Sequence, residues 1–206
     1  MMTDKEDAQT GPAWIGFSML IKLRLAGERS RVTGMKTCRT LFATLSMFIA
    51  TAALAGLPKV GDVAPVFHGT DQNGQTVKSS DLIGKKIVLL YFYPKDFTGG
   101  CTKEACGFRD RMGDLQKNNV EVIGVSFDTA DSHKSFIARY NLNFTLLADT
   151  DGKISDAYGT RMMGMKMSNR VSFLIGLDGK IVHVTNSGNP QKHFDEMQAA
   201  IASLQH

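Results

Sequence analysis

Two cysteines five residues apart, Cys101 and Cys106, are the side chains of this 206-residue chain whose type and spacing best suit chemistry. The first follows a strongly hydrophobic stretch, residues 87–93, and a turn that contains Gly99 and Gly100. A cysteine between a strand and a helix lies where unpaired backbone N–H groups favour the thiolate, the nucleophilic form. The second cysteine offers that thiolate a partner for oxidation. The spacing therefore indicates a redox site.

The turn before Cys101 carries groups that could assist such a thiolate. Thr98 offers a hydroxyl, and the two glycines allow backbone N–H groups to approach a ligand closely. A concave turn of donors suits a substrate oxygen that gains negative charge as a bond breaks. The alternative interpretation of both cysteines is that they are small buried apolar residues of a helix.

The spacing of the two cysteines also limits how they can pair. In a regular helix their Cα atoms would be about 8.5 Å apart and point ~140° away from each other, whereas a disulfide needs Cα atoms within about 7 Å. The pair can therefore bridge only if the first turns of the helix unwind. Zinc is not expected, because no second cysteine pair or cluster of histidines occurs. No chemistry is assigned to the scattered histidines, His68, His133, His183, His193 and His206.

Hydrophobic patterning predicts an α/β domain with a mixed central sheet flanked by helices. We expect buried strands at 87–93 and 121–127, a short strand at 144–147, a hairpin around Asn73-Gly74 and another at 171–184. We expect helices at 101–118 and 132–140, a helical turn at 154–158, and a last helix capped by Asn189. The expected core face of that last helix is Phe194, Met197, Ile201 and Leu204. Sites in such sheets form outside the carboxyl ends of the strands, where residues 94–101 lie.

The net charge of +4 is concentrated in the first 55 residues. Of the 24 Lys and Arg residues, seven lie there, as do four of the 20 Asp and Glu residues, so the remaining chain has a net charge of +1. Without a basic stripe, binding to nucleic acid is not expected.

The N-terminal segment has the parts of a secretory signal peptide. Met35 and Lys36 open a short positive region, residues 41–54 are mainly apolar, and Ala53-Leu54-Ala55 resembles a cleavage site. We predict an over-called extension at 1–34, a signal peptide at 35–55 and a mature domain at 56–206. The protein would then be periplasmic or secreted, and cytoplasmic if this interpretation is wrong. An uncleaved membrane anchor or a tail with a chance apolar run is the alternative.

The segment Pro94-x-x-x-Thr98-x-x-Cys101 matches the PxxxTxxC signature of peroxiredoxins. Residues 91–96 and 105–110 look like the peroxiredoxin Q, or bacterioferritin comigratory protein, class, and the similarity extends over residues 57–206. This resemblance implies a thioredoxin-like fold and a cofactor-free, metal-free thiol peroxidase of the atypical 2-Cys type. Its expected substrates are hydrogen peroxide and organic hydroperoxides, in antioxidant defence.

The resemblance also implies roles for individual residues. Cys101 would be the peroxidatic cysteine, which becomes a sulfenic acid, and Cys106 the resolving cysteine, which forms an intramolecular disulfide with it. A thioredoxin-like protein or another thiol reductant would reopen that disulfide. Thr98 matches the threonine that orients peroxide and thiolate, and Pro94 the proline that shields the pocket.

Three further positions bear on the comparison with this family. Arg170 matches the arginine that stabilises thiolate and peroxide, and Glu104 resembles the acidic or amide residue that positions it. Taken alone, both are also typical of solvated element ends. Gly99 stands where members of this class usually have proline. The glycine predicts a looser turn and a lower peroxide reactivity, with the mechanism retained. We expect a monomer or weak dimer.

Two other functions compete with the peroxidase. A thioredoxin-fold copper chaperone would use the methionine-rich residues 162–167, but its usual Cys-x-x-x-Cys spacing is missing. A thiol-disulfide oxidoreductase is disfavoured because no Cys-x-x-Cys occurs. We interpret residues 162–167 as a flexible apolar loop at the pocket rim.

Overall fold

The computed structural model describes residues 56–204. The predicted extension, signal peptide and cleavage site lie outside these described residues. Within the described part of the chain, no helix is long and apolar enough to cross a membrane.

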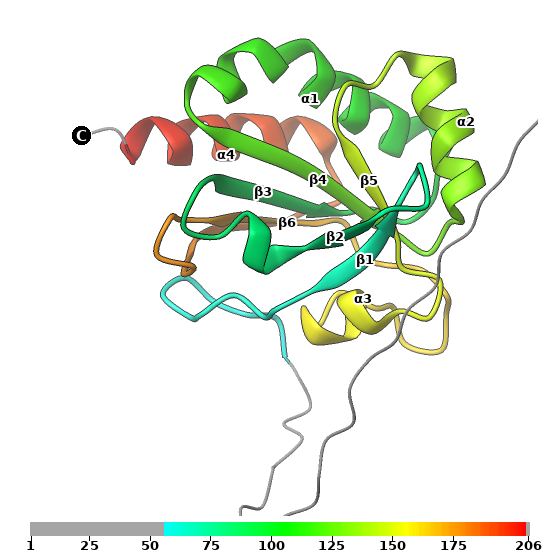
Figure 1. Cartoon of the computed structure of the whole chain (residues 1–206), viewed down its shortest axis with the longest axis horizontal. Coiled ribbons are helices and arrows are strands. Elements are labelled where there is room, and N and C mark those ends of the chain that lie inside the picture. Colours follow the sequence, from blue (N-terminus) through cyan, green and yellow to red (C-terminus); the bar gives the residue numbers. More distant parts are fainter. Residues whose placement is uncertain (1–55, 205–206) are drawn as a thin grey trace, which may run out of the picture. The chain divides into compact units, whose positions relative to one another are not determined.

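Strands and helices alternate along the chain, as the hydrophobic pattern predicts (Figure 1). The strands are β1 (His68–Asp71), β2 (Thr76–Lys78), β3 (Ile87–Phe92), β4 (Val120–Ser126), β5 (Thr145–Ala148), β6 (Val171–Ile175) and β7 (Ile181–Asn186). The helices are α1 (Gly99–Lys117), α2 (Ala130–Tyr140), α3 (Lys153–Ala157) and α4 (Pro190–Ser203), with a short 3-10 turn η1 (Ser79–Asp81).

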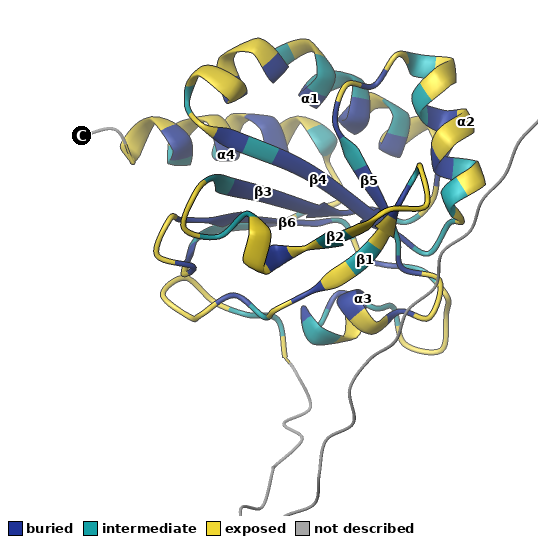
Figure 2. Ribbon diagram, viewed as in Figure 1, coloured by how far each residue is buried: buried dark blue, intermediate teal, exposed yellow. Residues whose placement is uncertain are grey.

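The strands form one mixed sheet in the order β2-β1-β5-β4-β3-β6-β7. Strands β3, β4 and β5 pair in parallel, whereas β1, β2, β6 and β7 join antiparallel. Helices α1, α2 and α4 lie over one face and α3 over the other (Figure 1). The central strands are buried on both faces, and β1 and β2 are largely exposed (Figure 2). The predicted mixed α/β architecture is confirmed.

Alternation along β3 divides the core into two layers. Leu89 and Tyr91 belong to the layer beneath α1 and α4, whereas Val88, Leu90 and Phe92 belong to the layer on the α3 side. Successive strand residues point to opposite faces, so a continuous apolar run indicates that both faces are covered.

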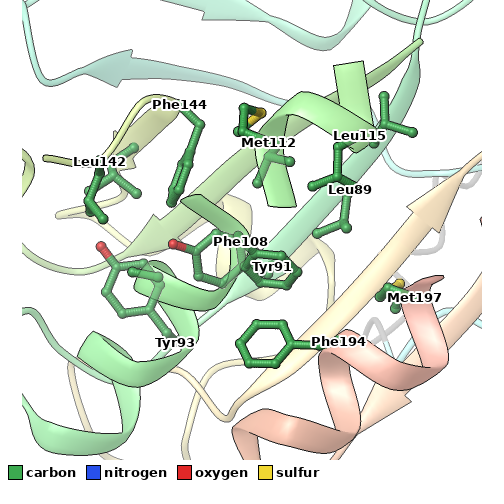
Figure 3. Close-up of a cluster of buried hydrophobic side chains, with 14 of the residues drawn as sticks. Leu89, Tyr91, Tyr93, Phe108, Met112, Leu115, Leu142, Phe144, Phe194 and Met197 are labelled. Carbon is green, nitrogen blue, oxygen red and sulfur yellow. The ribbon is translucent and has the colours of Figure 1, made fainter. Parts of the chain in front are cut away.

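Helices α1 and α4 pack closely against each other above the sheet. The rings of Phe108 and Phe194 meet edge to face with centroids 5.0 Å apart (Figure 3). A Cβ on Gly107 would lie only 2.1 Å from the Phe194 ring, so glycine permits this approach. Burial of one such aromatic side chain stabilises the fold by about 1.5–3 kcal/mol.

Several expected boundaries shift by one or two residues, and one expected core residue is exposed. Helix α1 begins at Gly99 rather than at Cys101, and β7 extends to Asn186. Leu204 was expected in the core but is 41% exposed, because α4 ends at Ser203 and Leu204 is only its C-cap. The other residues of the predicted core face of α4 are buried.

Candidate active site

The chain leaves the carboxyl end of β3, turns through residues 93–98 and enters α1 with Cys101 in the first helical turn. The Cys101 side chain is buried, and the residue is 1% exposed. Its position in the first turn places it among the N–H groups that no helical carbonyl satisfies. The sequence placed Cys101 correctly at a strand-to-helix junction.

Arg170 reaches the same point from a neighbouring strand. It directly precedes β6, whose first residue, Val171, pairs with Phe92 at the end of β3. Its Nη2 donates a hydrogen bond to Cys101 Sγ over 3.4 Å. The antiparallel register of β3 and β6 therefore brings residues 69 positions apart into contact.

Glu104 holds the other side of the guanidinium. It lies one helical turn after Cys101, is fully buried, and its Oε2 accepts a hydrogen bond from Arg170 Nη1. Burial raises the pKa of Glu104 to about 7, although the adjacent Arg170 opposes the rise. Burial alone would lower the pKa of Arg170, but the charges of Glu104 and Cys101 raise it above its usual value. The site thus contains a guanidinium that remains positive, facing one sulfur and one carboxyl group.

The hydroxyl of Thr98 forms its hydrogen bond within the turn formed by residues 93–98. Thr98 is the N-cap of α1 but makes no side-chain capping bond, and its Oγ1 donates to the Lys95 carbonyl over 3.0 Å. Pro94 is half-buried at the bend just after β3. Both residues therefore lie in the turn that precedes Cys101.

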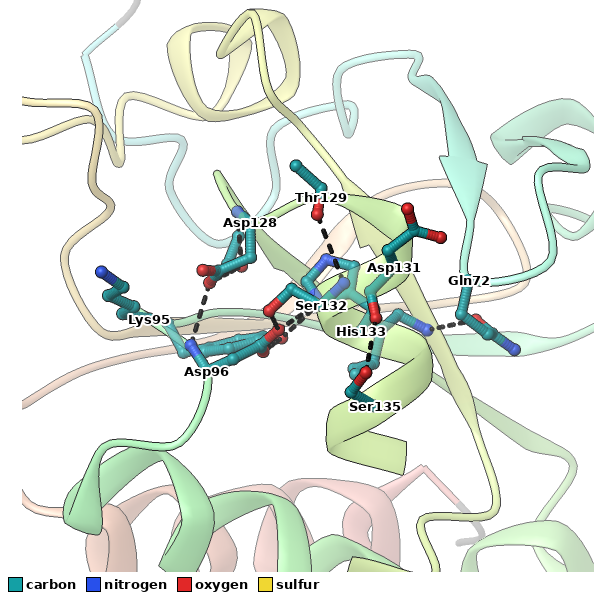
Figure 4. Close-up of polar contacts among 12 residues, drawn as sticks. Gln72, Lys95, Asp96, Asp128, Thr129, Asp131, Ser132, His133 and Ser135 are labelled. Carbon is teal, nitrogen blue, oxygen red and sulfur yellow. Dashed lines mark hydrogen bonds and ion pairs between the residues drawn. The ribbon is translucent and has the colours of Figure 1, made fainter. Parts of the chain in front are cut away.

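A buried polar network anchors this turn to α2, and the sequence did not indicate it. The Asp96 carboxylate accepts hydrogen bonds from Tyr93 Oη and Ser132 Oγ, both over 2.7 Å, and lies 2.9 Å from His133 Nδ1 (Figure 4). His133 Nε2 lies 3.1 Å from the Leu147 carbonyl oxygen. The only sequence signal was that His133 shares a helical stripe with the buried Phe136.

A second missed residue lies behind Glu104. His193, fully buried in the first turn of α4, has its Nδ1 2.7 Å from Ser172 Oγ and 3.6 Å from Glu104 Oε1. Its position four residues before the buried Met197 placed it on the core face of α4. This four-residue spacing is the sequence feature that could have indicated a buried His193.

The comparisons with known proteins agree with this geometry. A model of the AhpC/TSA family matches residues 60–184. Peroxiredoxin Bcp of Escherichia coli K12 is 43% identical over 143 residues, which cover 66% of this chain and 91% of the relative. The chain belongs to the AhpC/TSA family. Chloroplastic peroxiredoxin Q of Triticum aestivum is 39% identical over 163 residues, covering 75% of this chain and 72% of the relative.

Solved structures of similar proteins match the fold as well. Peroxidoxin BcpB from Mycobacterium tuberculosis gives a TM-score of 0.67 at 31% identity and covers 71% of this chain and 97% of its own. Peroxiredoxin Q of Xanthomonas campestris gives a TM-score of 0.63 at 25% identity, and the match covers 72% of this chain and 98% of that structure's chain. The predicted thioredoxin-like fold and the resemblance to the peroxiredoxin Q and Bcp class are confirmed, and the chain is a peroxiredoxin.

The second cysteine of this peroxiredoxin lies in the same helix as the first. Cys106 is half-buried, and both cysteines are free thiols in α1, which is continuous from Gly99 to Lys117. No disulfide joins cysteines in the described part of the chain. This arrangement agrees with the expectation that a regular helix keeps the two side chains apart.

Within residues 56–204, no group of three or more His, Cys, Asp or Glu side chains is arranged to hold a metal ion. The methionine-rich segment forms a turn that ends just before Arg170, with Met163 98% and Met165 58% exposed. Of the six residues predicted for the site, Cys101, Glu104 and Arg170 are in direct contact, while Pro94 and Thr98 lie in the adjoining turn and Cys106 further along α1.

Proposed function

We propose that this peroxiredoxin reduces hydrogen peroxide and organic hydroperoxides through Cys101 and resolves the oxidised cysteine with Cys106. The observation that carries the proposal is the 3.4 Å hydrogen bond from Arg170 Nη2 to the buried Cys101 Sγ. A fixed cation beside a sulfur in a helix first turn favours the thiolate, and only the thiolate attacks peroxide well.

In the first step the Cys101 thiolate attacks one peroxide oxygen. An S–O bond forms, the O–O bond breaks, and the departing hydroxide or alkoxide takes up a proton, leaving a sulfenic acid. Arg170 donors at the sulfur are placed to stabilise the negative charge that moves onto the oxygens. Pro94 would limit solvent access, and Thr98 would orient the peroxide once its hydroxyl leaves the Lys95 carbonyl.

In the second step the Cys106 sulfur attacks the sulfenic sulfur. An S–S bond forms and water leaves, and a dithiol reductant such as a thioredoxin-like protein then supplies two electrons to restore both thiols. The first turns of α1 must open for this step, because a regular helix keeps the two Cα atoms about 8.5 Å apart.

Stoichiometric peroxide added to the reduced protein tests the mechanism. We expect rapid loss of two thiols and a Cys101–Cys106 disulfide, identified by peptide mapping. Cys101→Ser should lose the rapid reaction, whereas Cys106→Ser should react once and stop at the sulfenic acid. Reaction at the rate of a free cysteine in the unmodified protein would reject the proposal.

We also propose that the mature protein begins near Gly56 after removal of a signal peptide, and that it is periplasmic or secreted. The positive start, apolar run and Ala-x-Ala sequence support this. Intact mass measurement of the protein from its native host tests it. A mass that requires residues before 50 would rule out cleavage.

A further inference from the structure

Phe97 has a backbone conformation that a bulky side chain rarely adopts. Its φ of 60° lies in the left-handed region, which favours glycine and, among other residues, asparagine and aspartate. Within residues 56–204, the other two non-glycine residues with positive φ are asparagines, Asn119 and Asn141. Such backbone strain persists only where surrounding contacts impose it. Phe97 immediately precedes Thr98, the N-cap of α1, so its contacts bear on how this helix begins.

The ring of Phe97 packs on helix α2. Its centroid lies 5.1 Å from that of Phe136, with the ring planes at 69°, and 6.4 Å from that of Tyr140. Edge-to-face contacts of this kind stabilise aromatic pairs. Phe136 is fully buried, whereas Phe97 is 49% exposed. The Phe97 ring therefore lies on the surface of α2, and it can leave α2 without opening a cavity in the core.

The preceding residue, Asp96, is attached by several hydrogen bonds. Its buried carboxylate accepts from Tyr93 Oη and Ser132 Oγ, and its backbone N–H donates to Asp128 Oδ2 over 2.9 Å (Figure 4). These bonds fix Asp96 against the start of α2. Phe97 is therefore the first residue beyond a fixed point, on the side of the chain that leads into α1.

The first turn of α1 has little stability of its own. It begins with Gly99 and Gly100, and glycine is a poor helix former. Thr98 makes no side-chain capping bond, because its hydroxyl donates to the Lys95 carbonyl. Tertiary contacts must therefore hold this turn closed, and the Phe97 ring supplies one of them at the point where the helix begins.

We propose that Phe97 is a positioning residue whose ring, packed on α2, holds the first turns of α1 closed around Cys101. The inference rests on the proposed disulfide with Cys106, for which these turns must open. On opening, the ring leaves α2 and the Phe97 backbone relaxes from its left-handed conformation. The ring contact thus favours the closed helix, and the backbone strain favours the open one.

The frequency of opening decides the fate of the Cys101 sulfenic acid. In the open form the Cys106 sulfur attacks it, an S–S bond forms and water leaves. In the closed form a second hydrogen peroxide molecule can transfer one oxygen to the sulfenic sulfur, which gives a sulfinic acid and water. Thiol reductants do not reverse the sulfinic acid. Phe97 therefore sets the ratio of disulfide to sulfinic acid.

Amide hydrogen exchange in the reduced protein measures the opening without any peroxide chemistry. In Phe97→Ala, exchange over residues 102–105 should accelerate by about tenfold, because two ring contacts with α2 are lost. Phe97→Tyr keeps the ring and should stay within about twofold of the unmodified protein. Phe97→Gly loses the ring but also the strain, so its acceleration should be smaller than that of Phe97→Ala. Equal accelerations in these two variants would overturn the role given to the strained backbone.

A peroxide titration in the presence of dithiothreitol measures the fate of the sulfenic acid. Mass spectrometry gives the peroxide concentration at which half of Cys101 has become sulfinic acid. This concentration should rise by about tenfold in Phe97→Ala and stay unchanged in Phe97→Tyr, since faster opening leaves less time for a second oxidation. An unchanged value in Phe97→Ala would overturn the inference alone. Failure of the unmodified protein to form the disulfide would reject the proposed function, and the exchange data would still test the ring contact.

A control and a variant on α2 complete the test. The control is Phe127→Ala, at a half-buried phenylalanine whose ring packs on Arg161, and it should leave both measurements unchanged. Tyr140→Ala removes part of the contact from the α2 side and covers the case in which Phe97→Ala does not fold. It should accelerate exchange over residues 102–105 by about threefold. No acceleration in Tyr140→Ala, or a double variant in which the two single effects multiply, would overturn the inference.

Discussion

Cys101 and Cys106 occupy one unbroken helix, with Cys101 buried at its first turn and Cys106 half-buried further along. The N-terminal N–H groups of this helix lie where they would stabilise a thiolate, and the regular geometry of the same helix keeps the two sulfurs apart. The proposed Cys101–Cys106 disulfide can therefore form only if the first turns of α1 open.

We predict that oxidation unwinds the start of α1. Treatment with one equivalent of peroxide should remove helical circular dichroism corresponding to about two turns, roughly seven residues. Amide hydrogen exchange over residues 102–106 should accelerate in the same sample. Cys106→Ser is the control, because it should form the sulfenic acid and keep the helix. A disulfide that leaves these amides protected would contradict the prediction.

Gly99→Pro should stabilise the protein and raise its peroxide reactivity. Gly99 is the first residue of α1, a Cβ there would meet no atom within 4 Å, and the preceding Thr98 already has the extended backbone that proline requires. The expected gain in the free energy of unfolding is about 0.4–1 kcal/mol, since proline reduces the entropy of the unfolded chain. Thermal unfolding and the second-order rate with peroxide are the measurements.

The neighbouring glycine provides the contrast. A Cβ on Gly100 would lie 3.1 Å from Arg170 Nη2, so Gly100→Ala should displace the guanidinium. We expect a slower reaction with peroxide and no loss of stability, because alanine favours the helix. If Gly99→Pro changed neither stability nor rate, the idea of a loosened turn would fail.

Local features of this site could be predicted from the sequence, whereas contacts between distant residues could not. The strands β3 and β4 and the position of Cys101 follow from local patterns, namely continuous apolar runs and a glycine turn before a helix. The contact of Arg170 with Cys101 depends on the β3–β6 register, and it was expected only through the family motif. Hydrophobic periodicity carries no information about which strands pair.

The histidines were missed for a different reason. His193 meets Glu104 only because Gly107 lets α4 approach α1, and His133 meets Asp96 across 37 residues of chain. A lone histidine has no spacing pattern of its own, so its partners become visible only after tertiary packing. The prediction that Leu204 is buried was wrong because the hydrophobic periodicity continues past Ser203, where α4 ends.

Glu104→Gln should change the pH dependence of stability. Burial raises the pKa of Glu104 from 4.5 to about 7, so the folded protein holds this proton more tightly than the unfolded chain does. The stability from this group is fully present below pH 4.5 and is lost as the pH rises to 7. The free energy of unfolding of the unmodified protein should therefore fall by about 3 kcal/mol relative to Glu104→Gln across this range.

Urea unfolding at pH 4.5, 6 and 8 measures this difference. The matched control is Asp114→Asn, also a carboxyl-to-amide change in α1, at a side chain that is 81% exposed. Its free energy of unfolding should track the unmodified protein at all three pH values. Parallel pH profiles for the unmodified protein and Glu104→Gln would show that the folded state does not hold the Glu104 proton more tightly.

Asp96→Asn should destabilise the protein strongly and loosen the turn before Cys101. The buried Asp96 carboxylate accepts hydrogen bonds from Tyr93 Oη and Ser132 Oγ and lies 2.9 Å from His133 Nδ1, so an amide at this position leaves buried polar partners poorly satisfied. Leaving a buried polar group without its partner costs about 1–3 kcal/mol for each group. Urea unfolding measures this cost, and the peroxide rate should fall as well, since Asp96 anchors residues 93–98 to α2.

The pairing itself is tested by a double-substitution cycle with His133→Gln. Once His133 is gone, Asp96→Asn should cost at least about 1 kcal/mol less than it does alone, because the contact between the two side chains has already been lost. Asp131→Asn, at an exposed carboxylate in the first turn of α2, is the control and should cost no more than about 1 kcal/mol. Additive losses for Asp96→Asn and His133→Gln would mean that the two side chains do not stabilise the turn through their mutual contact.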